Sequence, residues 1–249
     1  MSSLVILAGG KGGRFAPAAT KYYPKEMLPL GRLPAIHQVL EESLHPAFDR
    51  IVLLYRYHGD MLKHYISEEC HNIAKLIEFV EQGDSDLYGT GAAVLSLHER
   101  LRGEKKFAVS FPDDVILGGN VFDLIMPLAN AAEGVVASAK VDYCEAGQFG
   151  NLSVSEDRIM KIVQKPKPDE GLSNIALVSK LLLPEEIFEY LSSSFHGQEM
   201  DLGVAVAKMI DAGAIYKTAD VTGRWVTTGD PISYAKGLEL WRTKYSKTL

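Results

Sequence analysis

The stretch Leu4–Leu30, LVILAGGKGGRFAPAATKYYPKEMLPL, joins an apolar run to a glycine-rich loop. The run Leu4–Leu7 is apolar throughout, which predicts a buried β-strand. Glycines follow at positions 9, 10, 12 and 13, with Lys11 and Arg14 set among them. Glycines let backbone N–H groups approach an anion without a Cβ in the way, and an interleaved cation adds charge. A strand that runs directly into such a loop predicts a phosphate-binding site.

This loop differs from two common phosphate-binding motifs. The third glycine of G-x-G-x-x-G would fall on Phe15, and no G-K-[ST] closes the loop as in a P-loop. A tight turn with solvated lysines is the alternative interpretation. Arg14, Lys21 and Lys25 favour phosphate, because they place three cations near the same loop.

Composition restricts the classes of function. A chain of 249 residues suits one domain, or one domain with a small subdomain. The formal net charge of −6 argues against a nucleic-acid partner, although a pocket can be locally basic in an acidic protein. Cys70 and Cys144 have no metal or redox spacing, and the seven histidines have no ligand spacing. No apolar run is long enough for a membrane span and no leader precedes the first strand, so we expect no membrane partner and a cytoplasmic location.

The first half of the chain alternates strands with helices. Strands are predicted at 4–7, 51–55, 76–80, 107–111 and 134–140, and helices at 34–42, 61–66, 92–101 and 121–132. This rhythm predicts an α/β fold with a parallel sheet that is covered on both faces. Ligands of such sheets bind beyond the carboxyl ends of the strands. The glycine loop and Asp113 both follow predicted strands, so we expect them to share one crevice.

The second half has a different pattern. Three strand-like runs, Gly150–Val154, Ile159–Gln164 and Ile175–Leu183, lie close together and predict antiparallel strands that extend or flank the main sheet. Helices are predicted at 184–192, 201–211 and 231–244. Asp230 and Pro231 have the residue types of a cap and a first-turn proline for the last of these.

The segment AGGKGGRFAPAATKYYPKEMLPL resembles the signature of the sugar-nucleotide pyrophosphorylases, and especially of the bacterial UTP–glucose-1-phosphate uridylyltransferases. That signature reads A-G-x-G-x-R-x-x-P-A-T-K-x-x-P-K-E-M-L-P, and this chain has one extra residue between Arg14 and Thr20. Later segments that resemble the family follow in the same order: Gln82-Gly83 with Gly89–Ala92, Phe111–Asp114, Phe149-Gly150, Val163–Pro168 and Ser173–Ala176. The resemblance covers nearly the whole chain.

The resemblance implies a single nucleotidyltransferase domain over residues 1–249. Its sheet would be Rossmann-like, of the GT-A-like type, mostly parallel and flanked by helices, with a small antiparallel sugar-binding extension. The nucleotide-binding part would span about 1–140 and the sugar-binding part about 141–249. In the implied reaction, an oxygen of a sugar 1-phosphate attacks the α-phosphorus of a nucleoside triphosphate, and pyrophosphate leaves.

The resemblance also implies roles for particular residues. Arg14, Lys25 and Asp113 would be catalytic; Ala8, Gly9, Gly10, Gly12, Gln82, Gly89 and Gly91 would bind the nucleotide; Gly150, Gln164, Lys165 and Asn174 would bind the sugar phosphate. The amide of Gln82 both donates and accepts, which suits the edge of a pyrimidine. Asp113 would hold Mg²⁺ together with substrate phosphates, and Asp230 is a second candidate ligand. A capping role for Asp113 after Pro112 is the alternative, and Asp114 is expected to be its structural neighbour.

Two positions depart from the family pattern. Thr227 stands where the family carries a second metal-binding aspartate, and a threonine hydroxyl is a weak, neutral ligand. Either the metal relies on Asp113 and the substrate phosphates, or Asp230 replaces that aspartate; a helix cap is the favoured role for Asp230. Gln164 stands where the family has a glutamate, and it brings no charge. The sugar is therefore left open by the sequence.

Two classes of function follow from these residues. The leading hypothesis is a Mg²⁺-dependent enzyme that makes a UDP-sugar, or a related pyrimidine nucleotide sugar. The alternative is a pseudoenzyme or regulatory protein that holds a nucleotide sugar on the same fold, a hypothesis that Thr227 keeps open. A dinucleotide-dependent oxidoreductase is disfavoured by the missing third glycine. Both remaining hypotheses predict small-molecule ligands, and neither decides whether the chain forms a homo-oligomer.

Overall fold

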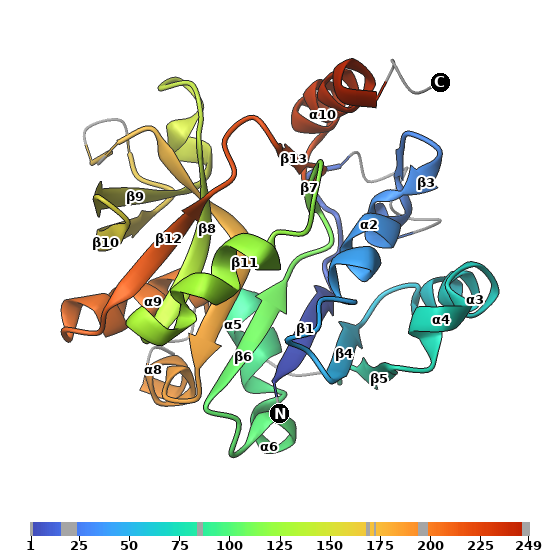
Figure 1. Cartoon of the computed structure of the whole chain (residues 1–249), viewed down its shortest axis with the longest axis horizontal. Coiled ribbons are helices and arrows are strands. Elements are labelled where there is room, and N and C mark those ends of the chain that lie inside the picture. Colours follow the sequence, from blue (N-terminus) through green and yellow to red (C-terminus); the bar gives the residue numbers. More distant parts are fainter. Residues whose placement is uncertain are drawn as a thin grey trace.

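The described residues form a mixed sheet of nine strands at the centre of the molecule (Figure 1). The structure is a computed structural model and describes residues 2–15, 24–83, 87–167, 170–171, 173–193 and 199–245. The strand order is β5-β4-β1-β6-β11-β8-β12-β10-β9. The strands are β1 (Ser3–Ala8), β4 (Arg50–Tyr55), β5 (Ile77–Glu81), β6 (Lys106–Ser110), β8 (Gly134–Lys140), β9 (Gly150–Ser155), β10 (Arg158–Gln164), β11 (Ile175–Pro184) and β12 (Tyr216–Asp220).

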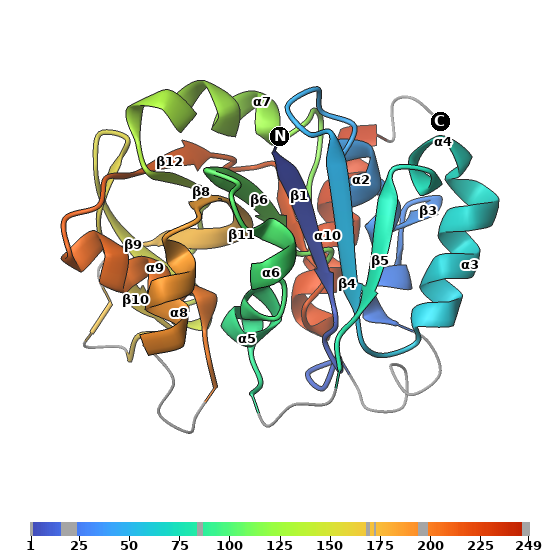
Figure 2. The same cartoon turned by 90° about the horizontal axis from the view of Figure 1, so that it is seen from below.

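Helices cover both faces of the sheet, as the alternating pattern predicted. Successive residues of β1 point to opposite faces: Leu4 and Ile6 belong to one hydrophobic core, and Val5 and Leu7 to the other. The helices that contribute to the first core are α2 (Ala35–Glu42), α3 (Gly59–Glu69), α4 (His71–Ala74) and α7 (Phe122–Ile125). Those of the second core, side by side in Figure 2, are α5 (Thr90–Leu95), α6 (His98–Leu101), α8 (Ile187–Ser193) and α9 (Leu202–Asp211).

The α/β fold is confirmed, but the sheet is mixed rather than mostly parallel: its main parallel part is the first four strands, and β8 and β12 form a further parallel pair. β5, β4, β1 and β6 are parallel neighbours, whereas β11 pairs with β6 and with β8 in antiparallel fashion. The run Ile175–Leu183 was expected to form an antiparallel strand that extends or flanks the main sheet; β11 is antiparallel, yet it lies in the middle of the sheet. The physical reason is its composition: its last five residues, Lys180–Pro184, are all buried, and a strand buried on both faces has to be central. The register shifts between Val178 and Leu181, which places a bulge at Ser179.

Several elements carried too little sequence signal to be predicted. β12, with the sequence YKTAD, has few apolar residues but pairs in parallel with β8. The two-residue and three-residue strands β2 (Pro29–Leu30), β3 (Leu33–Pro34), β7 (Asp114–Ile116) and β13 (Trp225–Thr227) form two small antiparallel ribbons. The helix expected at 121–132 divides into α7 and the 3-10 helix η2 (Met126–Ala131), which has a proline in its first turn. The other two 3-10 helices are η1 (Lys25–Met27) and η3 (Ala146–Gln148).

The carboxyl ends of the four parallel strands meet at one edge of the sheet. β1 leads into Gly9, β4 into Arg56, β5 into Gln82 and β6 into the turn that carries Asp113. All four residues line the same cavity, so the predicted crevice exists. The last helix, α10 (Pro231–Tyr245), begins directly after this cavity and packs on β13 (Figure 1). Among the described residues, none of the helices has both the length and the apolar character needed to cross a bilayer.

Candidate active site

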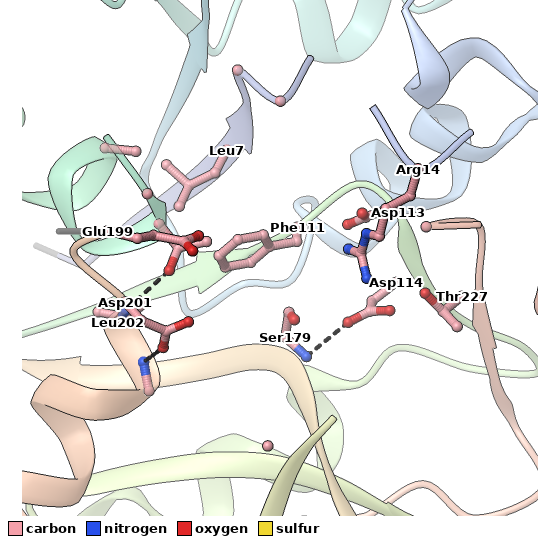
Figure 3. A pocket seen from close by; sticks show the side chains of 18 of the residues that line it. Leu7, Arg14, Phe111, Asp113, Asp114, Ser179, Glu199, Asp201, Leu202 and Thr227 are labelled. Atoms are coloured by element: carbon pink, nitrogen blue, oxygen red, sulfur yellow. Dashed lines mark hydrogen bonds between the residues drawn. The ribbon is translucent and has the colours of Figure 1, made fainter. Parts of the chain in front are cut away.

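A cavity of about 580 Å³ opens at this edge of the sheet, and both halves of the chain line it. Figure 3 shows Arg14, Asp113 and Thr227 on one side, Glu199, Asp201 and Leu202 on the other, and Phe111 between them. The predicted site residues that it brings together are Gly9, Gly10, Arg14, Lys25, Gln82, Gly89, Asp113, Gly150, Gln164, Lys165 and Asp230. A volume of this size suits a small organic ligand.

Four predicted residues do not line this cavity. Ala8 is the buried last residue of β1, and Gly12 forms a turn whose carbonyl accepts from Phe15 N at 2.9 Å. Gly91 lies buried in the first turn of α5. Asn174 exchanges hydrogen bonds with Val141, with its own Nδ2 3.0 Å from the Val141 carbonyl oxygen. Their ligand-binding roles stay predictions, as does the role of Lys21, which lies outside the described residues.

The glycine loop lies against two polar side chains from other segments. An ideal Cβ on Gly9 would stand 3.0 Å from Gln82 Oε1, and one on Gly10 would stand 3.3 Å from Lys25 Cε. Contacts at 3.0–3.4 Å are tighter than ordinary van der Waals packing, so side chains at these positions would displace Gln82 and Lys25. The glycines thus let the loop backbone, an amide and an ammonium group gather in one place. This is the arrangement that a phosphate-binding loop requires.

Lys25 and Asp113 form an ion pair on the cavity wall. Lys25 begins η1, and its side chain is only 14% exposed. Burial opposes the charge on each group, yet their mutual attraction prevails: the pKa of Asp113 is lowered, with Arg14 contributing, and the pKa of Lys25 is raised. Both groups are therefore charged at neutral pH.

Asp114 has a different environment from its neighbour. Its Oδ2 accepts from Ser179 N at 2.9 Å, and its Oδ1 accepts from Trp225 Nε1 at 2.9 Å. Burial, together with the charge of Asp113, raises the pKa of the Asp114 carboxyl. Both oxygens are committed to joining β7, the β11 bulge and β13, which is the structural role expected for Asp114 (Figure 3).

On the side of the cavity that carries Arg14 and Thr227 (Figure 3), Asp113 is the carboxylate available to a metal ion, because its partner Lys25 can be exchanged, whereas Asp114 and Asp230 are committed to hydrogen bonds within the protein. Asp230 caps α10, since Oδ1 accepts from Ile232 N and Ser233 N at 3.0 Å each and Oδ2 accepts from Ser233 Oγ at 2.6 Å. No group of three or more His, Cys, Asp or Glu side chains in the described part of the chain is placed to hold a metal. An ideal Cβ on Gly229 would stand 3.7 Å from Asp113 Oδ2 and 3.5 Å from Thr227 Oγ1, so glycine leaves space beside both oxygens. One carboxylate and one hydroxyl fit a Mg²⁺ ion that takes its other ligands from phosphates and water.

The cavity also contains residues that the sequence did not indicate. Glu199 and Asp201 supply carboxylates near Gln164 and Lys165. Arg56 and Tyr57 follow β4, and the Tyr57 ring lies 5.5 Å from Arg56 Cζ and 5.6 Å from Lys11 Nζ. The strand-end rule would have found Arg56 and Tyr57. Nothing in the sequence marks Glu199, and Asp201 was visible only as the start of a helix.

Comparison with known proteins identifies the family. A profile described as nucleotidyl transferase matches residues 3–243. The chain belongs to this family. A UTP–glucose-1-phosphate uridylyltransferase of Pseudomonas aeruginosa is 30% identical over 232 residues, covering 82% of this chain and 82% of that protein. A second relative, UTP–glucose-1-phosphate uridylyltransferase 2 of Staphylococcus saprophyticus, is 25% identical over 264 residues, covering 93% of this chain and 89% of its own length.

Solved structures agree with the fold of this nucleotidyl transferase. A UDP-glucose pyrophosphorylase in complex with UDP-glucose superposes with a TM-score of 0.84 and 24% identity, covering 99% of both chains. A UTP-bound enzyme of the same name from Acinetobacter baumannii gives a TM-score of 0.77 at 22% identity, covering 99% of this chain and 95% of the other. The predicted fold class and family are thereby confirmed.

Proposed function

We propose that this nucleotidyl transferase joins a nucleoside triphosphate, with UTP as the preferred nucleotide, to a hexose 1-phosphate and releases pyrophosphate. The observation that carries the proposal is that cations from both halves of the chain line one cavity: Arg14 and Lys25 beside the glycine loop, and Lys165 on the opposite side. Two polyanions must meet in this reaction, and each therefore needs its own cations. The names of the two curated relatives support UTP and glucose 1-phosphate as the first substrates to test.

The proposed chemistry is one displacement at phosphorus. An oxygen of the sugar phosphate forms a bond to the α-phosphorus, and the bond from that phosphorus to the oxygen bridging to the β-phosphorus breaks with both electrons on the leaving pyrophosphate. No side chain acts as a nucleophile. Arg14 and Lys25 stabilise the charge on the triphosphate, and Lys165 holds the sugar phosphate in line for attack. The Lys25 ammonium leaves its ion pair with Asp113 when phosphate oxygens replace the carboxylate.

We propose that Asp113, assisted by Thr227, holds Mg²⁺. When bound, the ion would neutralise charge on the phosphates. Because Asp113 is paired with Lys25, and its neighbours Asp114 and Asp230 are committed to hydrogen bonds within the protein, we expect the ion to bind tightly only together with the nucleotide. Calorimetric titration of Mn²⁺ as a Mg²⁺ substitute should detect binding in the presence of UTP and little without it. Thr227→Asp should create measurable nucleotide-independent binding, and an unchanged titration would show that position 227 does not face the ion.

The reaction is tested by pyrophosphate release with UTP, Mg²⁺ and a panel of hexose 1-phosphates, each with the other nucleoside triphosphates as controls. We expect release with at least one pair, and the reverse reaction from the matching UDP-sugar and pyrophosphate. Lys161→Ala, a change on the exposed face of β10, is the matched surface control and should not alter turnover. If calorimetry detects UDP-sugar binding but no pair yields pyrophosphate, the enzyme proposal is refuted and a binding protein remains.

A further inference from the structure

Asp201 is held in place by two independent sets of contacts. Its Oδ1 caps α9, accepting from Gly203 N at 2.7 Å and Val204 N at 3.3 Å. The segment around it pairs with the loop before α5: Met200 N donates to the Tyr88 carbonyl at 2.9 Å, and Leu202 N donates to Thr90 Oγ1 at 2.9 Å (Figure 3). Oδ2 has no hydrogen-bond partner among the described residues, and Asp201 lines the cavity. The backbone is thus fixed while one carboxylate oxygen is free for a ligand.

The amide of Gln164 lies between two glycines next to this carboxylate. An ideal Cβ on Gly150 would stand 2.9 Å from both Gln164 Nε2 and Oε1, and one on Gly203 would stand 1.6 Å from Nε2. That same point on Gly203 is 3.1 Å from Asp201 Oδ1, so the amide and the carboxylate are close neighbours. Any side chain at position 203 would expel the amide.

The local charges favour a neutral group at position 164. Burial, with a contribution from Glu199, raises the pKa of Asp201, while its helix-capping hydrogen bonds and Lys165 act in the opposite direction. A further carboxylate at position 164 would add repulsion at close range in a partly desolvated site. An amide avoids this repulsion and still offers one donor group and one acceptor.

We propose that Asp201 and Gln164 are a matched pair that determines sugar specificity, with Asp201 Oδ2 accepting from one sugar hydroxyl and the Gln164 amide contacting the hydroxyl on the neighbouring carbon. This inference rests on the proposed function and deepens it. The substrate class is a hexose 1-phosphate with two adjacent free hydroxyl groups. Lys165, beside this pair, is placed for the phosphate of the same molecule.

The test is a charge exchange between the two positions. Asp201→Asn keeps a residue that caps helices well but removes the charge, and Gln164→Glu adds a charge. Each single variant should raise KM for the sugar 1-phosphate about ten- to a hundred-fold, the effect of a charge-assisted hydrogen bond, and leave KM for UTP within about twofold. In the double variant the charge has moved from one residue to the other. The fold-increase in its KM for the sugar 1-phosphate should therefore be smaller than the product of the two single fold-increases. If the increase in the double variant equals the product of the two single increases, the proposed pair is refuted. It is also refuted if the KM values for the sugar 1-phosphate and for UTP rise equally.

A series of monodeoxy hexose 1-phosphates supplies a second readout. The wild-type protein should discriminate against the analogue that lacks the hydroxyl read by Asp201, by about ten-fold or more, and Asp201→Asn should lose that discrimination. Asp201→Ser, which also caps the helix, replaces Asp201→Asn if the latter does not fold, as judged by its thermal midpoint. If the wild type releases pyrophosphate and the variants keep its KM values and its discrimination, only the specificity pair is refuted. No release with any sugar phosphate refutes the proposed function and the pair with it.

Discussion

Two lysine–carboxylate pairs lie near the carboxyl end of strand β6, and they differ in their access to solvent. Lys25 and Asp113 face the cavity, with side chains 14% and 15% exposed. Lys180 and Glu42 are 2.7 Å apart inside the protein, with side chains 0% and 5% exposed, and Lys180 also donates to Ser110 Oγ at 2.7 Å. The same chemical groups thus occur once where ligands can reach them and once where they cannot.

The difference shows that burial decides which role a lysine–carboxylate pair can have. A charge pair on a cavity wall can exchange its partner for a phosphate or a cation, because the ligand replaces the lost attraction. A sealed pair cannot be exchanged, and removing one member leaves a buried charge without a partner. We therefore expect the exposed pair to control turnover and the sealed pair to control stability.

Lys180→Met should have the largest effect on the fold. It leaves Glu42 buried without its ammonium partner, and the free energy of unfolding should fall by about 3–5 kcal/mol in urea denaturation. Turnover per folded molecule should stay near the wild-type value at low temperature. The double variant Lys180→Met/Glu42→Met removes both charges and should recover most of the loss. A change of less than about 1 kcal/mol in the single variant would contradict the structural role of this pair.

Lys25→Ala should have the largest effect on the reaction. Removing a cation that stabilises the triphosphate should lower kcat by about 10²–10³-fold, comparable with the loss of one transition-state donor. The free energy of unfolding should change much less than in Lys180→Met, because Asp113 stays accessible to water and counterions. Steady-state kinetics and urea denaturation on the same preparation separate the two effects. Equal losses of activity and stability would count against a phosphate-binding role.

Glu26, next to Lys25, is a buried carboxylate with too few hydrogen-bond partners among the described residues. It is 1% exposed, its Oε1 has no hydrogen-bond partner among the described residues, and burial raises its pKa from 4.5 to about 7. At pH values between 4.5 and about 7, Glu26 holds a proton in the native state that it has released in the unfolded state. This group therefore lowers the free energy of unfolding as pH rises from 4.5 to 7, by about 3 kcal/mol in total.

Glu26→Gln should abolish this contribution. The difference in unfolding free energy between the variant and the wild type, measured in urea at a series of pH values, should move in favour of the variant as pH rises through the window. Glu239→Gln, the same change at an exposed position of α10, is measured beside it as the matched surface control. A flat difference for Glu26→Gln would mean that Glu26 ionises normally in the folded protein.

Asp230 gives the smallest expected effect and separates a capping carboxylate from the metal ligand. Asp230→Ala should lower stability by about 1 kcal/mol through loss of the α10 cap, and Asp230→Asn should lose less. Neither variant should weaken Mn²⁺ binding in the presence of UTP, whereas Asp113→Asn should. Loss of metal affinity in Asp230→Asn, with its cap retained, would assign Asp230 to the metal site.

Much of the fold was readable from local patterns. The apolar runs predicted β1, β4 and β6 to within a residue or two, and β8 without error, because each is buried on both faces and bounded by turn residues. The cap of α10 at Asp230 was readable for the same reason, since capping depends on residues close in sequence. The position of β11 was not readable, because strand order depends on which distant segments pair, and no local pattern encodes that choice.

The sequence by itself indicated the glycine loop, the cation-rich segment after it and Asp113, because the loop and Asp113 each follow an apolar strand-forming run and the carboxyl ends of parallel strands meet at one edge of the sheet. Only the tertiary structure decided which of the carboxylates can exchange its partner for a ligand. Asp113 pairs with Lys25 on the cavity wall. The Asp114 carboxylate accepts hydrogen bonds from Ser179 and Trp225, and the Asp230 carboxylate accepts from the α10 backbone. Tertiary packing alone brought Asp201 beside Gln164, because that contact joins the start of α9 to the end of β10. Burial and partner availability are properties of the folded chain, and they separate residues that are chemically alike in the sequence.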